Sequence, residues 1–425
     1  MVVGATIGGG ILGTPGSVAA ALPSTPLFLG VWIFGGISAM LGATVYAELG
    51  TMMPSSGGIY VFARRAYGDG VGFFVGYADW LNWSVSSAAL ILLVGDYLGG
   101  VIPVLAGHSL GAGCAVFAGL IALQWLGVKS GGRVQEVTSV MKALALLALV
   151  VAAFALPHDQ MPAATTAPPA VPHGLALLLA LGVAMQGVIF SYDSYYSVVY
   201  CGEEIRDPGH AIPRSIFRGL LIIIAIYLLI NVAFLTVVPL ARLAGDPFVG
   251  GTVARMIFGS SGDVVIRLIA IVAILGTVNA QIMAAPRILL AMARDGLFPE
   301  QATRVNAGGT PTVALLASLV LVGGFLFLGS FDTVLGVDAF LIGVLYLITY
   351  GALFRLRRTE PNAPRPYRAW GYPFVQALAV LIALGLIGAM ALGDKRGAAI
   401  TGGALLASWP VWVVARRFMR AGTRS

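Results

Sequence analysis

Long apolar runs separated by short polar segments follow one another along almost the whole chain. Two clear examples are Leu221–Val238 and Val265–Ala285, and each has about the length needed to cross ~30 Å of hydrocarbon as a helix. The pattern predicts twelve membrane-spanning helices, at residues 2–22, 28–53, 72–100, 112–128, 135–156, 174–202, 215–239, 263–292, 311–329, 333–355, 372–393 and 398–418. The expected fold is therefore an all-α membrane protein.

Composition supports a membrane location and excludes several other classes of protein. Charged residues make up 10% of the 425 residues, where a soluble domain has roughly 25%. Cys114 and Cys201 fall on opposite sides of the membrane in the predicted topology, so they cannot form a disulfide. The four histidines lie in loops without the spacing of metal ligands, so neither a metal nor a cofactor is expected.

Basic residues outnumber acidic ones, 25 to 18, but they are scattered between apolar runs, so they do not indicate nucleic-acid binding. Most of them fall in alternate loops and in the C-terminal tail. Since cytoplasmic loops are enriched in Lys and Arg, this asymmetry predicts that both termini are cytoplasmic. The high Ala and Gly content is compatible with a bacterial inner (plasma) membrane.

No second domain is expected, because the two longest connecting segments are too polar or Pro-rich to bury a core. The segment 157–172 is predicted to be extracellular, and the basic segment 355–372 cytoplasmic. The first span has no basic flank before it, so we expect the natural protein to begin some residues earlier. No charged region typical of a signal peptide is present at the start of the sequence.

The first span contains a glycine motif with two possible meanings. Gly8, Gly10 and Gly13 form a G-x-G-x-x-G pattern, which is typical of dinucleotide-binding loops. Such a loop requires an acidic residue about 20 positions later, but none occurs before Glu48, and Pro15 lies where the following helix should run. Within a membrane, glycines either allow close helix packing or let the helix unwind beside a cavity. Three consecutive glycines followed by a proline favour unwinding.

The sixth span is also interrupted. Its middle, Phe190–Tyr195, places Ser191, Asp193 and Ser194 at a depth where hydrocarbon is expected. An ionisable residue at that depth is costly, and it is therefore a candidate functional residue. Because the two interrupted spans lie five spans apart, the pattern predicts two five-helix halves with a binding site at their interface.

Five segments together resemble the amino acid permeases of the amino acid–polyamine–organocation superfamily, and most closely their L-type-like branch. The segments are GATIGGGILGTPG (4–16), YAELGTMMPSSGGIYVFARRAYG (46–68), GRVQEVTSVMKALAL (132–146), FSYDSYYSVVYCGEEIRDPGHAIPRSI (190–216) and TVNAQIMAAPRILLAMARDGLFP (277–299). The resemblance implies a core of ten helices at 1–355, made of inverted repeats at about 1–156 and 174–355. Two peripheral helices and a cytoplasmic tail would occupy residues 356–425.

The resemblance also implies a function. Permeases of this kind move amino acids by alternating access, usually as proton symporters or exchangers, and they are not enzymes. In this chain the substrate carboxylate would be bound by backbone N–H groups, and its amine by backbone carbonyls. The Phe190 ring would cover the substrate as a lid. The implied substrate-binding residues are Thr6, Ile7, Gly8, Gly9, Gly10, Ile11, Phe190, Ser191 and Asp193.

Two roles remain open for Asp193. Its carboxylate could contact the substrate amine, or it could cap the second half of the sixth span, which is the interpretation we favour. After Tyr-Asp, the family commonly has Gly-Trp, whereas this chain has Ser194 and Tyr195. The local unwinding and the choice of substrate depend on this position.

Lys142 lies within the fifth span and has no acidic residue three or four positions away. It could extend toward the cytoplasmic face. The resemblance implies instead that its ammonium replaces a structural sodium ion, as the matching lysine does in sodium-independent relatives, and it could also carry a coupling proton. We favour a structural or coupling role.

The remaining candidates concern the inner gate and competing functions. Arg64 could pair with Glu203 or Glu204 at the cytoplasmic end of the sixth span. A polyamine or cationic-amine permease would need acidic residues in the cavity, for which Asp193 is the clear candidate. A non-transporting nutrient receptor would have the same binding site. An intramembrane enzyme is not expected, since no nucleophile–base or metal cluster occurs at depth. The expected partners are an amino acid, protons and membrane lipid, with no nucleic acid and no obligatory protein partner.

Overall fold

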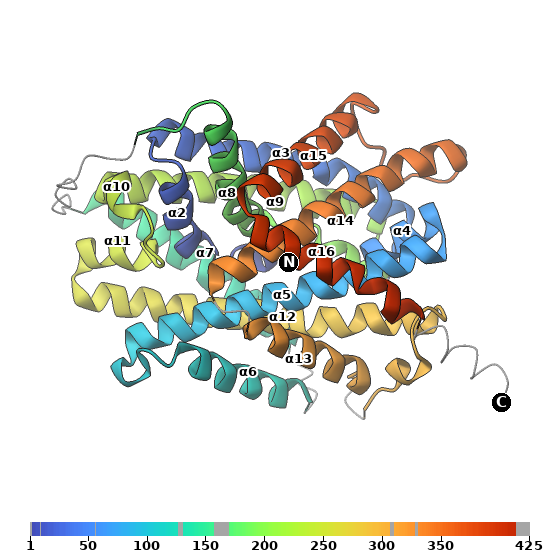
Figure 1. Ribbon diagram of the computed structural model, residues 1–425, viewed down its shortest axis with the longest axis horizontal. Coiled ribbons are helices and arrows are strands. Elements are labelled where there is room, and N and C mark those ends of the chain that lie inside the picture. The colour runs from blue at the N-terminus through green and yellow to red at the C-terminus, as the bar shows by residue number, and fades with distance from the viewer. Residues whose placement is uncertain are drawn as a thin grey trace.

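The computed structural model describes residues 2–8, 10–55, 57–125, 131–156, 170–306, 310–327 and 330–413. The described residues are almost entirely helical, with an isolated β-bridge between Val305 and Pro311. The longest helices lie side by side along the long axis of the molecule (Figure 1). This arrangement agrees with the all-α prediction.

In the part of the chain that the structure describes, helices lie within each of the predicted spans. They are α1 (Val2–Thr6) with α2 (Gly10–Ala21), α3 (Thr25–Met52), α5 (Asp69–Val101), α6 (Ser109–Trp125), α7 (Gly131–Ala155), α8 (Leu175–Tyr192) with η2 (Ser197–Glu204), α9 (Pro208–Val237), α12 (Ser260–Arg294), α13 (Thr312–Leu326), α14 (Phe331–Thr359), α15 (Phe374–Gly393) and α16 (Lys395–Leu406). Within the described part of the chain, seven of these are long and apolar enough to cross a membrane unaided, namely α3, α5, α8, α9, α12, α14 and α15.

Short helices lie at the two ends of the helical bundle. At one end is α4 (Ile59–Tyr67), and at the other are α10 (Leu240–Leu243) and α11 (Val249–Phe258) (Figure 1). Two single turns complete the connections, η1 (Pro103–Leu105) and η3 (Glu300–Thr303). The end that carries α4 also carries the basic segment after α14.

Helix α5 lies at the centre of the packing, against α4, α6, α12, α13 and α14. A second group forms where α3 packs on α8 and α9, and α2 packs on α8. Small residues make these approaches possible. A Cβ atom at Gly35 would lie 2.3 Å from the side chain of Val188, so α3 and α8 come into contact only because Gly35 has none. Because α2 packs on α8, the two interrupted spans are neighbours.

Helix α2 begins at Gly10 and continues through Pro15 to Ala21, so the break lies at the glycines and not at the proline. The proline ring removes the backbone donor that would reach the Ile11 carbonyl four positions earlier. One residue before it, the Thr14 hydroxyl donates a hydrogen bond of 2.8 Å to the Gly10 carbonyl. Proline is tolerated within membrane helices that are packed against other helices.

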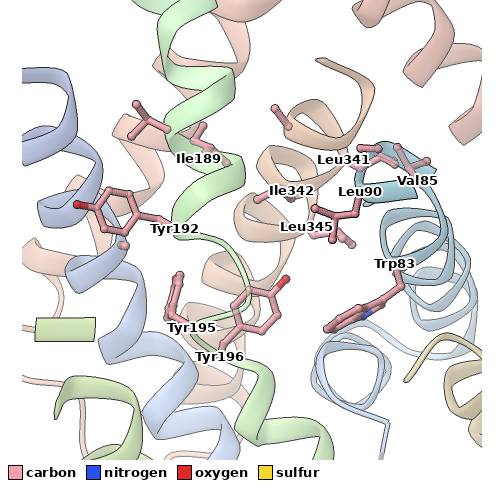
Figure 2. Packing of buried hydrophobic residues seen from close by; sticks show 14 of the residues in the cluster. Trp83, Val85, Leu90, Ile189, Tyr192, Tyr195, Tyr196, Leu341, Ile342 and Leu345 are labelled. Atoms are coloured by element: carbon pink, nitrogen blue, oxygen red, sulfur yellow. The ribbon is translucent and has the colours of Figure 1, made fainter. Parts of the chain in front are cut away.

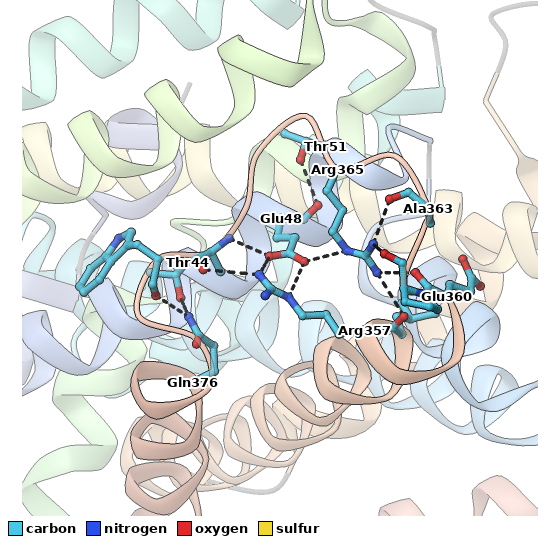
Figure 3. A network of polar contacts seen from close by, with 12 residues as sticks. Thr44, Glu48, Thr51, Arg357, Glu360, Ala363, Arg365 and Gln376 are labelled. Atoms are coloured by element: carbon cyan, nitrogen blue, oxygen red, sulfur yellow. Dashed lines mark hydrogen bonds and ion pairs between the residues drawn. The ribbon is translucent and has the colours of Figure 1, made fainter.

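The basic segment after α14 contacts a buried acidic side chain of α3. Glu48 of α3 is fully buried and pairs with Arg357 and Arg365, the latter at 3.1 Å (Figure 3). The backbone N–H of Ala369 donates to the same carboxylate at 2.7 Å. Arg365 also donates to the carbonyls of Leu356, Glu360, Pro361 and Ala363. The segment thus fastens the ends of α14 and α15 to α3.

Candidate functional site

Both predicted helix breaks are present. Helix α1 ends at Thr6 and α2 begins at Gly10, while α8 ends at Tyr192 and η2 begins at Ser197. Figure 2 shows the second break as the point where α8 stops and Tyr195 and Tyr196 turn into the interior. At Ser194 the backbone has a φ of 68°, the left-handed conformation that a glycine adopts without cost. The serine therefore makes the turn for which the family commonly uses glycine.

A small cavity of about 30 Å³ lies where the two breaks meet. This volume is enough for a water molecule but not for an amino acid, so the site is contracted. Its wall contains most of the predicted substrate-binding residues and five others, four of them polar and one a leucine. The lining is Thr6, Gly8, Gly10, Ser86, Leu90, Phe190, Ser191, Asp193, Ser194, Thr277 and Gln281.

The cavity wall offers hydrogen-bonding groups that have no protein partner. The Thr6 hydroxyl is buried and makes no hydrogen bond. Helix α2 starts at Gly10, so the N–H groups of its first turn, including that of Ile11, have no partner within the helix. A helix N-terminus of this kind attracts negative charge. The wall can therefore receive an anionic group at α2 and an additional polar group at Thr6.

Gly10 is needed for the two breaks to approach each other. A Cβ atom there would lie 3.2 Å from the Ser191 hydroxyl and 3.3 Å from the Phe190 ring. These distances are tighter than ordinary van der Waals contact. Gly10 thus lets α2 begin directly against the end of α8.

Tyr227 connects the two breaks, and the sequence analysis did not identify it. Its hydroxyl on α9 donates to the Ser191 carbonyl at 2.8 Å and lies 3.1 Å from the Thr6 carbonyl. Both carbonyls belong to the last turn of a half-helix, where intrahelical donors run out. A single tyrosine within the apolar run Leu220–Ile230 was the available signal. The structure thus brings together two carbonyls that were predicted to bind the substrate amine.

The interpretation of Asp193 as a helix cap is wrong. The helix that follows it, η2, has Tyr196 at its N-cap position and no side-chain cap hydrogen bond. The carboxylate instead accepts a hydrogen bond of 3.1 Å from the Tyr346 hydroxyl of α14. The wide turn at Ser194 moves Asp193 away from the first N–H groups of η2, so it faces the cavity and α14.

Lys142 does not extend toward the membrane surface. Its side chain is 3% exposed, and its ammonium donates a hydrogen bond of 3.0 Å to the Thr277 hydroxyl of α12. Thr277 also lines the cavity, so one side chain separates the lysine from the site. Helix α7 packs on α1 as well as on α12. The ammonium therefore lies beside the first helix break, where the resemblance had implied a cation.

Phe190 separates the small cavity from a larger one. Its ring packs edge-on against Phe331, with the ring centroids 6.0 Å apart. Phe331 lines a cavity of about 680 Å³ at the end of the bundle that carries α10 and α11. This vestibule also includes Ser17, Asp96, Gln186, Asp246 and Asp332. A lid at Phe190 agrees with this position.

A family model described as "Amino acid permease" matches residues 1–415. The chain belongs to the amino acid permease family. It is 29% identical to the serine/threonine exchanger SteT of Bacillus subtilis over 423 residues, which is 97% of this chain and 94% of that protein. It is 25% identical to the branched-chain amino acid permease BcaP of the same species, over 91% of this chain and 85% of BcaP. The b(0,+)-type amino acid transporter 1 of mouse is 25% identical, over 91% and 80% of the two chains.

These similarities confirm the resemblance drawn from the five sequence segments. The protein is an integral membrane permease that acts in amino acid transport, and it is not an enzyme. Gly9 and the side chains of Cys201 and Glu204 lie outside the described residues, as do most of the predicted extracellular segment 157–172 and the C-terminal tail from 414.

At the α4 end of this permease, Arg64 forms ion pairs with Asp69 and Asp295, both at 2.8 Å. The hydrogen bond to Asp69 and the proximity of Asp295 raise the pKa of the Arg64 guanidinium. The Tyr60 hydroxyl also donates to Asp295 at 2.8 Å. These two partners come from the start of α5 and the C-cap position of α12, whereas the sequence had suggested Glu203 or Glu204.

Proposed function

We propose that this permease is a secondary active transporter that moves small neutral amino acids across the membrane by alternating access. The observation that carries the proposal is the cavity between the two helix breaks, with the N-terminus of α2 on one side and the unpartnered Thr6 hydroxyl on the other. An α-amino acid needs an anion site and a cation site a few ångströms apart, and the breaks supply both.

The α-carboxylate binds at the first turn of α2, through the N–H groups of Gly9, Gly10 and Ile11. The α-amine binds to the carbonyls at the ends of α1 and α8, with Asp193 nearby. The rest of the wall consists of hydroxyl, amide and apolar groups, and its one carboxylate is that of Asp193 among the residues that line the cavity. A neutral side chain fits such a wall, and the similarity to a serine/threonine exchanger and a branched-chain permease supports the same size class.

The arrangement supports an outward-facing conformation with a contracted site. The vestibule reaches Phe331 from the α10–α11 end, while Tyr46, Tyr195, Tyr196, Tyr346 and Tyr350 pack together on the opposite side of the site. We place the α4 end and both termini in the cytoplasm, and the protein in the inner (plasma) membrane. The inverted repeats at 1–156 and 174–355 form the moving core, and residues 356–425 are peripheral.

Lys142 supports sodium independence. A buried ammonium beside the first helix break supplies the positive charge that a bound sodium ion would otherwise supply. Transport is then driven either by a proton gradient or by exchange against an internal amino acid.

Uptake into proteoliposomes tests this proposal. The panel is labelled serine, threonine, leucine, arginine and a polyamine, each with and without an inward proton gradient and with and without internal amino acid. We expect serine- or threonine-sized neutral substrates to be taken up in sodium-free buffer, and Lys142→Ala to abolish uptake. A preference for arginine or the polyamine would favour the cationic-amine alternative. Specific binding with no flux would favour a receptor.

A further inference from the structure

A second buried carboxylate, outside the substrate site, contacts the inner half of the sixth span. Asp79 of α5 is fully buried. Both of its carboxylate oxygens lie 2.9 Å from the Tyr200 hydroxyl of η2. One hydroxyl has one hydrogen, so an ionised carboxylate would have to share that hydrogen between its two oxygens. With a proton on the Asp79 carboxyl, each group would donate one hydrogen bond to the other.

Among the described residues, the groups around the Asp79 carboxyl include no Lys, Arg or His side chain. They are hydroxyls, an indole and a second carboxylate: Tyr200 from η2, Tyr196 and Asp193 from the break before it, Tyr46 from α3, and Trp83 from its own helix. At the α4 end of the bundle, Tyr60 and Arg64 both contact Asp295. An unpaired charge is unfavourable in such a setting, whereas a protonated carboxyl is not.

Tyr200 lies between Asp79 and the cytoplasmic end of the bundle. Its ring packs edge-on against Trp83, with the centroids 5.5 Å apart. On its other side the ring is covered by the loop between α3 and α4, where a Cβ atom at Gly58 would lie 2.2 Å from the tyrosine. Unlike Asp79, Tyr200 is partly exposed. The tyrosine thus covers Asp79 on the side of the loop before α4, at the end of the bundle that we place in the cytoplasm.

We propose that Asp79 and Tyr200 form a proton-binding site that couples the inner gate to a proton. With η2 seated on α5, Asp79 holds a proton that it received from the outward side through the substrate cavity. When η2 moves away to open the site inward, Tyr200 leaves and water reaches the carboxyl. The O–H bond then breaks, the carboxylate keeps the electron pair, and the proton passes to cytoplasmic water. Reprotonation from the outside is required before η2 can return without the cost of an unpaired buried charge.

This inference rests on the proposed transport function, and one preparation distinguishes the two. The full chain is reconstituted in proteoliposomes that contain a pH-sensitive dye. Two quantities are measured with serine: one-for-one exchange of labelled substrate at equal pH, and internal acidification when substrate is added outside. We expect about one proton per substrate in the wild type. In Asp79→Asn we expect acidification to fall at least tenfold, while exchange stays within about twofold of the wild-type rate. The reason is that the amide has nearly the same shape as the carboxyl but cannot bind and release a proton.

Asp338→Asn is the matched control, since Asp338 of α14 is also a buried carboxyl and lines neither the substrate cavity nor the vestibule. It should retain both exchange and acidification. Should Asp79→Asn fail to fold, Tyr200→Phe decides the question, because it keeps the ring and removes the hydroxyl. We expect it to admit protons without substrate, so that its proton-to-substrate ratio departs from that of the wild type.

The proton site would be overturned if the Asp79→Asn variant acidified the interior as much as the wild type does. It would also be overturned if Tyr200→Phe left the proton-to-substrate ratio unchanged. Exchange without any acidification in the wild type would also overturn it, while leaving the transporter itself intact. Absence of exchange and uptake in the wild type would overturn the proposed function as well.

Discussion

The Tyr227 hydroxyl donates a hydrogen bond of 2.8 Å to the Ser191 carbonyl. This bond joins the seventh span to the end of α8, at the point where the sixth span opens into the substrate cavity. The Thr6 carbonyl lies 3.1 Å from the same hydroxyl, so one side chain holds both helix breaks in place. The geometry of the proposed amine site therefore depends on a residue that does not line the cavity.

Replacing Tyr227 with Phe should weaken both substrate binding and folding. The change leaves two buried carbonyls without this donor, at a cost of about 1–3 kcal/mol. We expect a lower thermal midpoint in detergent and a raised KM for uptake. Tyr97→Phe is the matched control, because the Tyr97 hydroxyl is buried without a hydrogen-bond partner and its removal should cost little. Equal behaviour of the two variants would argue against the role of Tyr227.

Gly10→Ala should reduce affinity for the substrate. Its new methyl group would lie 3.3 Å from the Phe190 ring and would push the lid or the start of α2 away, an overpacking cost of about 1–3 kcal/mol. Substrate binding by isothermal calorimetry measures the effect. Gly323→Ala in α13, where a Cβ atom meets nothing within 4 Å, should bind as the wild type does.

At Ser194, glycine and alanine should have different effects on stability. The left-handed conformation costs an L-residue roughly 1–2 kcal/mol, whereas glycine adopts it freely but loses more entropy on folding. Ser194→Gly should therefore be about as stable as the wild type or more so, and clearly more stable than Ser194→Ala. Thermal midpoints of the three proteins, measured under identical detergent conditions, test this order. An alanine variant as stable as the glycine variant would contradict it.

Glu48→Gln should destabilise the protein strongly. The change leaves Arg357 and Arg365 close together and largely buried without their counter-charge, and breaking a buried pair costs about 3–5 kcal/mol. Unfolding should become easier, and protease should cleave the segment after α14 sooner. A stability loss below about 1 kcal/mol would show that the network is not needed to hold this segment.

The ion pair between Arg65 and Glu360 is partly exposed, unlike the buried pairs of Glu48. Its contribution to stability should depend on pH. The hydrogen bond from Arg65 lowers the pKa of Glu360. A lowered folded-state pKa means that the stabilisation is present above the unfolded value of about 4.3 and is lost as pH falls through the folded value. Because the pair is partly exposed, Glu360→Gln should cost below about 1 kcal/mol at pH 7. That difference should vanish in acid; a difference that persists there would contradict this account.

The sequence was sufficient to locate the spans and both breaks, because each is a local property of the chain. An apolar run of the right length predicts a membrane helix, and the glycines at 8–10 and the polar residues at 191–194 mark where it opens. Lys142 could also be identified from the sequence, because it is a charged residue within an apolar span. Helix α2 continues through Pro15, because proline is a strong helix breaker in water but is tolerated within a packed membrane protein.

Local pattern does not specify which distant side chains meet. Tyr227 with Ser191, Lys142 with Thr277, and Asp79 with Tyr200 each join different spans. Their partners follow from the rotation and crossing of packed helices, which small residues such as Gly35 permit and which no single segment encodes. The sequence alone thus determined a membrane permease with two interrupted helices. The tertiary structure alone decided which groups bind, brace and gate the site, because hydrogen bonds at depth depend on the three-dimensional approach of helices that are distant along the chain.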